Sequence, residues 1–141
     1  MEVQINYVAV LLATLASMFV GFVWYAKPVF GKMWMDLVGL DEKAQQKGAT
    51  AAIVQALLAG FLTAYVLAHV TYISQSFYGV SYMESALNTA FWLWLGIAAT
   101  TVVIHNAFEQ RRKKLTLLTV ANELVTFLSM GFVLGLLPPA F

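Results

Sequence analysis

Apolar residues occur along the chain in four long runs that polar breaks separate. Each run has 23 to 27 residues, and the approximate limits are 3–26, 49–73, 82–108 and 115–137. At about 1.5 Å per residue, α-helices of this length exceed the bilayer hydrocarbon core of about 30 Å. Strands of a membrane barrel need only about 10 residues each. The pattern therefore predicts an all-α fold, a four-transmembrane-helix bundle that forms one membrane domain over residues 1–141.

A shorter helical pattern fills the first polar break, after Pro28. Apolar residues recur there at i, i+3, i+4 and i+7: Phe30, Met33, Trp34 and Leu37. Lys32 and Asp36 lie four residues apart on the opposite side, and Gly39 can end the helix. This amphipathic pattern predicts a short interfacial helix over about residues 28–39.

The composition indicates that lipid is the solvent for most of the chain. Apolar residues make up 61% of the chain and charged residues 11%, whereas a soluble domain carries about 25% charged residues. Too little polar sequence remains to cover a surface in water, so a disordered chain and a nucleic-acid-binding domain are excluded. The absence of cysteine excludes disulfides, thiolate metal ligands and cysteine nucleophiles.

The basic residues predict the orientation in the membrane. All eight lie in the first and third breaks: Lys27, Lys32, Lys43, Lys47, Arg111, Arg112, Lys113 and Lys114. Residues 74–81, the second break, contain none. Because cytoplasmic connections are enriched in Lys and Arg, we expect a multi-pass membrane protein with both termini on the outer, non-cytoplasmic side. We also expect residues 111–114 to contact anionic lipid headgroups.

Two rows of small residues predict where helices pack. A small residue recurs every four positions in the first two runs: Ala9, Ala13, Ser17 and Gly21, then Ala52, Ala56, Gly60, Ala64 and Ala68. Such rows allow helix backbones to approach closely in a bilayer. A four-helix bundle has little interior, so we expect one row to contact another subunit, in a homo-oligomer or a larger membrane complex.

The third and fourth runs show a heptad-like spacing instead. The positions are Phe91, Trp94, Ala98, Thr101, His105 and Phe108 in the third run, and Thr116, Thr119, Glu123, Thr126 and Met130 in the fourth. Only a short basic turn separates the two runs. The spacing therefore predicts an antiparallel hairpin in which these two stripes face each other.

Glu123 is the one acidic residue deep in a predicted span. A carboxylate at the centre of a membrane helix costs on the order of 3 kcal/mol, so it must be paired, hydrated or protonated. It is either a structural residue bonded to Asn or Thr of a neighbouring helix, or a proton or ligand site. For the second interpretation we expect a cytoplasm-facing pocket with these residues: Glu123, His105, Thr101, Thr119, Gln55 and Trp94.

The chain contains no signature of catalysis. With two histidines on different leaflets, we expect no metal site, no cofactor and no catalytic residue.

Two motifs at the predicted cytoplasmic end resemble those of a known family. They are Gly21-Phe22-Val23-Trp24-Tyr25 with Phe30-Gly31-Lys32-Met33-Trp34-Met35, and His105-Asn106-Ala107-Phe108-Glu109 followed by Leu115. Over nearly its whole length the chain resembles the bacterial integral-membrane family called domain of unknown function 1761. The resemblance implies a four-helix protein of the bacterial inner membrane without an assigned activity.

Three functions remain open. The first is a homo-oligomer whose pocket binds or moves a proton or small ligand, and the second is a non-catalytic accessory subunit of a larger membrane complex. The third is a membrane enzyme acting on a lipid or thiol conjugate, since the topology is loosely similar to that of the eicosanoid and glutathione membrane-enzyme superfamily. Glu123 favours the first function, and a non-enzymatic role is favoured.

Overall fold

The computed structural model describes residues 2–140 as a bundle of helices. In chain order the elements are α1 (Tyr7–Trp24), the π-helix η1 (Lys27–Gly31), α2 (Lys32–Val38), α3 (Glu42–Tyr78), α4 (Tyr82–Leu93), the π-helix η2 (Trp94–Ala99), α5 (Thr100–Phe108) and α6 (Lys113–Leu136). Four helices, α1, α3, the continuous Tyr82–Phe108 and α6, are long and apolar enough to cross a membrane. The prediction of an all-α bundle of four such helices is confirmed.

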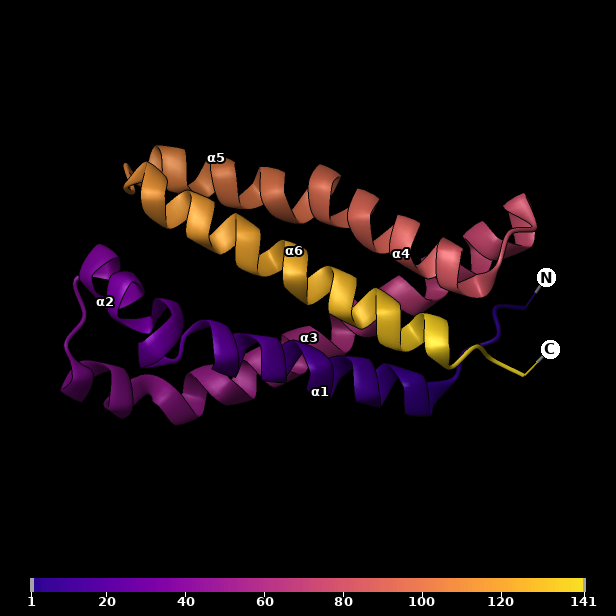
Figure 1. Ribbon diagram of the computed structural model, residues 1–141, viewed down its shortest axis with the longest axis horizontal. Helices are drawn as coiled ribbons and strands as arrows, with labels where there is room; N and C mark the ends of the chain where they lie inside the picture. The colour runs from indigo at the N-terminus through magenta and orange to yellow at the C-terminus, as the bar shows by residue number, and fades with distance from the viewer. Residues whose placement is uncertain (1, 141) are drawn as a thin grey trace.

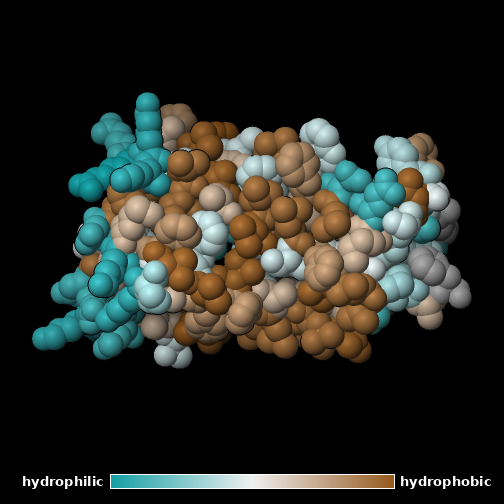
Figure 2. All heavy atoms as spheres, viewed as in Figure 1, coloured by the Kyte–Doolittle hydropathy of each residue, from teal (hydrophilic) through white to brown (hydrophobic). Residues whose placement is uncertain are grey.

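The long helices run along the length of the molecule (Figure 1). The helix α6 packs against both α1 and α4, and α3 packs against the same two helices. Both termini lie at one end, and α2 lies at the other end with the α5–α6 turn. We call the latter the basic end, because it holds the lysines and arginines of the two basic connections. Figure 2 shows hydrophilic residues gathered there and mostly hydrophobic residues along the middle of the molecule.

A short helix follows the first long helix, as the sequence predicts. Gly39 ends α2 in the left-handed conformation, with φ 73°, and its N–H donates to the Met35 carbonyl oxygen at 2.9 Å. Between α1 and η1, the chain turns at Ala26, which is extended, and the helical residue Gly31 packs against this turn. A Cβ atom on Gly31 would contact the Tyr25 carbonyl oxygen and lie 2.9 Å from Ala26 backbone atoms. Only glycine therefore fits at this contact without a backbone shift.

The core occupies the half of the bundle nearer the termini. Its buried residues are mostly small or aliphatic: Ala9, Val10, Ala13, Ala64, Leu67, Ala68, Ala86, Ala90, Met130 and Leu134. Helices approach closely here, since a Cβ atom on Gly60 would lie 2.9 Å from the Ser17 Oγ. The two small-residue rows therefore meet within one chain, between α1 and α3, from the core down to Ser17 and Gly60.

Toward the basic end, α3 leaves this packing. Its residues 50–59 are all exposed, whereas Ala64, Leu67 and Ala68 are buried. The helix also begins before the predicted apolar run, at Glu42, because the Asp41 side chain caps it by accepting the Ala44 N–H at 2.7 Å. One half of α3 is thus a packed core helix, and the other half has an uncovered surface.

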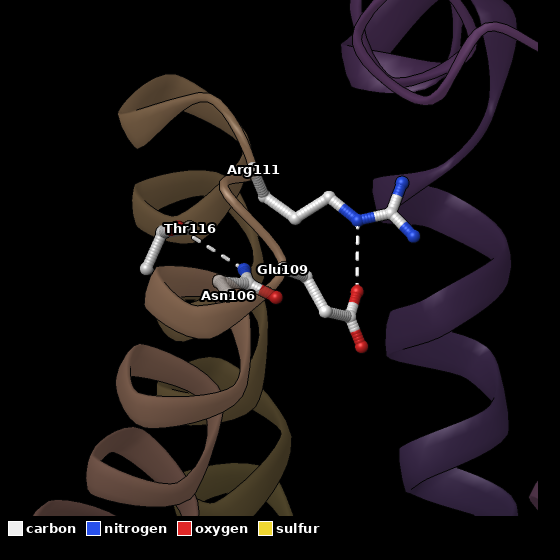
Figure 3. Close-up of polar contacts among 4 residues, drawn as sticks. All are labelled: Asn106, Glu109, Arg111 and Thr116. Atoms are coloured by element: carbon white, nitrogen blue, oxygen red, sulfur yellow. Dashed lines mark hydrogen bonds and ion pairs between the residues drawn. The ribbon is translucent and has the colours of Figure 1, made fainter.

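The predicted facing stripe of the third span is wrong toward the basic end. Phe108 is 89% exposed, and Thr101 and His105 are also exposed. Asn106 faces α6 instead, and its Nδ2 donates to the Thr116 Oγ1 at 3.0 Å (Figure 3). The π-helix η2 is the reason, since a π-bulge inserts one residue into the helical repeat and shifts the inward face by one position.

Candidate functional site

A cleft of about 800 Å³ lies between α1, α3 and α6 toward the basic end. Its α3 wall is made largely of small residues, including Gly48, Ala49, Ala52, Ala56, Ala59 and Gly60. The other walls come from α1, with Ser17, Met18, Gly21, Phe22 and Tyr25, from α6, with Asn122, Glu123, Thr126, Phe127 and Met130, and from Trp34 of α2. We call this space the Glu123 cleft. It exists because α3 diverges from α1 beyond the Gly60–Ser17 contact.

Glu123 is half-buried in the wall of the cleft. Among residues 2–140, its carboxylate forms no hydrogen bond and no ion pair. It is also the single charged side chain in the lining of the cleft. A carboxylate in this state calls for a cation, a proton or water, because an unpaired charge away from water is costly.

Tyr25 lies close enough to Glu123 for the carboxylate to affect the ionisation of its phenol. It lies just beyond the end of α1, where its ring packs edge-on against Trp34 with centroids 5.3 Å apart. Burial raises the pKa of Tyr25 to about 12, and the nearby Glu123 carboxylate contributes to the rise. The phenol therefore stays neutral and keeps its O–H as a potential donor in the cleft.

Asn122 adds a second polar group to the α6 wall. It is only 7% exposed, and its Nδ2 has no hydrogen-bond partner among the described residues. A buried donor without a partner costs about 1–3 kcal/mol. On α1, the Ser17 Oγ donates to the Thr14 carbonyl oxygen at 2.7 Å and keeps its lone pairs free to accept. The cleft thus combines a carboxylate, an amide and hydroxyls within apolar walls.

The other residues predicted for the Glu123 pocket do not line the cleft. The Trp94 Nε1 donates to the Val120 carbonyl oxygen at 3.0 Å, and the Thr119 Oγ1 donates to the Leu115 carbonyl oxygen at 3.0 Å. These two bonds serve helix packing and the helix backbone, and neither residue lines the cleft.

The other three predicted residues also lie outside the lining. Gln55 is exposed on α3, and His105 and Thr101 are exposed on α5. Tyr25 and Asn122 line the cleft but were not predicted as site residues from the sequence. Adjacency to Glu123 is a signal that could have found Asn122, whereas Tyr25 was indistinguishable from an interfacial aromatic residue.

The basic cluster, residues 111–114, spans the end of the α5–α6 turn and the first two residues of α6. The Arg111 Nε lies 2.9 Å from the Glu109 Oε2, and both side chains extend away from the hairpin (Figure 3). The remaining three basic residues of the cluster, Arg112, Lys113 and Lys114, are exposed. Their contact with lipid headgroups stays a prediction.

The family comparison covers every long helix. The model of the family described as "Protein of unknown function (DUF1761)" matches residues 8–135. The chain belongs to the DUF1761 family. This confirms the resemblance to the family, and the matched range contains both motifs, the first of which includes Tyr25 and Trp34 of the cleft. No curated protein and no solved structure matches this DUF1761 chain.

Proposed function

We propose that this DUF1761 protein is a multi-pass protein of the bacterial inner membrane whose Glu123 cleft binds a small lipophilic cation in exchange for a proton. The observation that carries the proposal is an unpaired carboxylate in the wall of an apolar cleft of about 800 Å³. Small-molecule sites have volumes of about 300–1,000 Å³, with mostly apolar walls and few polar groups. The cleft has this size and this composition.

The walls favour a cation over other ligands. Glu123 supplies the single negative charge, and no lysine or arginine lines the cleft. Tyr25 and Trp34 add aromatic faces, which attract cations through the ring quadrupole. The small side chains of Ala52 and Ala56 leave room for an apolar group against α3. A hydrophobic cation matches all three features.

The proposed orientation determines from which side of the membrane a ligand would enter the cleft. With the basic end at the cytoplasm and both termini outside, the cleft opens in the inner half of the membrane. Gln45 and Gly48 line it near the basic end, and the exposed half of α3 borders it at the side. A lipophilic cation would enter from the cytoplasm or the inner leaflet.

The affinity for tetraphenylphosphonium, measured by titration calorimetry in detergent, tests the proposal. Glu123→Gln keeps the shape of the side chain and removes its charge, so we expect it to weaken binding at least tenfold, about 1.4 kcal/mol. Glu109→Gln, a carboxylate outside the cleft, is the matched control and should bind normally. Uncharged triphenylphosphine oxide should bind the wild type weakly. Equal affinities of the wild type and Glu123→Gln would refute the cation site.

Proton release on binding tests the exchange separately. A carboxylate in an apolar wall is neutralised by a proton when no cation is present. In weakly buffered detergent solution, we expect tetraphenylphosphonium to release protons from the wild type and none from Glu123→Gln. Tight binding without proton release would leave a cation site but rule out the exchange.

A second candidate is a role in assembly, supported by the exposed surface of α3. The small residues at 52 and 56 are exposed, so a helix of a second copy or of a larger complex would pack there. Ala56→Cys in native membranes would then form disulfide-linked dimers if the assembly is a homo-oligomer. Efficient cross-linking together with no tetraphenylphosphonium binding would favour assembly over the cation site.

A further inference from the structure

A second pocket lies at the opposite end of the molecule from the basic connections. It has a volume of about 560 Å³ and lies between α3 and α4. From Glu84 in the first turn of α4 it continues to Trp92, eight residues or about 12 Å along the helix. We call it the Glu84 pocket. It shares no lining residue with the Glu123 cleft.

The mouth of the pocket carries a negative charge that nothing in the described chain neutralises. Glu84 is the single charged residue of the lining, and its carboxylate forms no ion pair among residues 2–140. The lysines and arginines all belong to the first and third connections. Glu84 lies in the first turn of α4, where a negative charge interacts favourably with the helix dipole. The Ser81 Oγ caps the same turn by accepting the Glu84 backbone N–H at 3.2 Å. The carboxylate oxygens remain available to a ligand.

A buried hydroxyl below the mouth also lacks a partner. Ser85 is 1% exposed and lines the pocket, and its Oγ forms no hydrogen bond among the described residues. A helical serine usually donates to a carbonyl oxygen of the preceding turn. The free Ser85 hydroxyl, with the side chain of Asn88 one turn further along, offers oxygen acceptors beside Glu84.

The deeper part of the pocket is apolar. Val70 and Leu93 line it, together with Trp92, which is 63% exposed although it lies well inside a long apolar helix. The pocket therefore changes from acidic and polar at the end of the molecule to hydrocarbon-like toward the middle. An amphiphile that lies in a membrane leaflet has the same polarity gradient.

We propose that the Glu84 pocket binds a phospholipid with a primary ammonium headgroup, whose ammonium contacts Glu84 and whose acyl chain lies along Trp92 and Leu93. A primary ammonium has three N–H donors, which match the carboxylate and the oxygens of Ser85 and Asn88. A trimethylammonium headgroup has no N–H to donate, and the Glu84 carboxylate repels an anionic headgroup. This specificity is independent of any ligand in the Glu123 cleft.

Lipid competition measured by native mass spectrometry tests the proposal. The full chain is purified in detergent and incubated with equal amounts of phosphatidylethanolamine, phosphatidylcholine and phosphatidylglycerol. We expect the wild type to retain phosphatidylethanolamine over phosphatidylglycerol on the order of tenfold, since a charge-assisted hydrogen bond replaces a repulsion. Glu84→Gln should lose most of this preference, and Glu109→Gln, outside both spaces, should keep it.

A second variant controls for the loss of the favourable charge at the start of α4 in Glu84→Gln. Ser85→Ala leaves Glu84 and the Ser81 cap in place, and we expect it to fold normally while its preference for phosphatidylethanolamine falls several-fold. Thermal unfolding of each variant in the same detergent reports on folding. An unchanged preference in both folded variants, or a wild type that retains phosphatidylglycerol equally well, would overturn the proposal.

Discussion

Tyr25 shows how one side chain can serve both packing and a site. Its ring packs on Trp34 and so helps to hold α2 against the end of α1, while its phenol shares the cleft with Glu123. Its raised pKa, about 12 against an ordinary value of 10.0, is caused first by burial and second by the carboxylate. Tyr25 therefore links the stability of the fold to pH in the alkaline range.

Replacing Tyr25 by Phe should remove part of the alkaline destabilisation. Between about pH 10 and pH 12 the unfolded state loses the Tyr25 proton first, so the stability of the wild type falls as the pH rises through this window. Tyr25→Phe has no proton to lose and should be less sensitive. Unfolding temperatures at about pH 9 and about pH 11 measure the difference. Tyr78→Phe, an exposed residue at the other end, should behave like the wild type. A Tyr25→Phe variant with the wild-type pH dependence would contradict this account.

The helices α4 and α6 cross so closely that glycine is required at the contact. A Cβ atom on Gly131 would lie 2.8 Å from the Ala90 Cβ and 2.9 Å from the Ala86 carbonyl oxygen. Close crossings of this kind are typical of helices in a bilayer, where helix association depends mainly on van der Waals contact. The half of the bundle nearer the termini contains these close crossings and the core, whereas α3 has an uncovered surface in the other half.

Gly131→Ala should destabilise the bundle by about 1–3 kcal/mol, because backbone atoms of α4 must move to admit the methyl group. Gly96→Ala is the matched control, since a Cβ atom there meets nothing within 4 Å. The control should be neutral or stabilising by up to about 1 kcal/mol through helix propensity. Unfolding in mixed detergent micelles measures both variants. Equal stabilities would show that the α4–α6 crossing relaxes without cost.

The whole molecule has two chemically different ends. Both basic connections are at one end, and both termini and the Glu84 pocket are at the other. An apolar middle separates the ends, and its exposed residues are mostly large and hydrophobic. The proposed orientation assigns the first end to the cytoplasm, and therefore the Glu123 cleft to the inner half of the membrane.

Single cysteines at Ser76 and Gln110 should react from opposite sides of the membrane. The chain has no cysteine of its own, so there is no background labelling. Both positions are exposed, Ser76 near the end of α3 and Gln110 in the α5–α6 turn. A membrane-impermeant maleimide on intact cells should label Ser76→Cys, and Gln110→Cys only after the membrane is opened. Labelling of Gln110→Cys from outside would invert the proposed orientation.

Features that depend on neighbours in the chain were predictable from the sequence. The four long helices and the short helix that ends at Gly39 each follow from residues within a few turns of one another. The position of Glu123 in the wall of an apolar helix was predictable as well, because it depends on the sequence around it, whereas its role as a site stays a prediction.

Which residues line the Glu123 cleft and the Glu84 pocket depends on contacts between segments that are distant in the sequence. The π-helix η2 shifts the register, so His105 and Thr101 point away from α6, although their spacing predicts the opposite. The divergence of α3 from α1 beyond Gly60 opens a cleft and brings Tyr25 and Asn122 together with Glu123. Hydrophobic periodicity specifies which residues prefer the interior, but crossing points and register come from packing across the bundle. For this reason the helices can be read from the chain, and the site cannot.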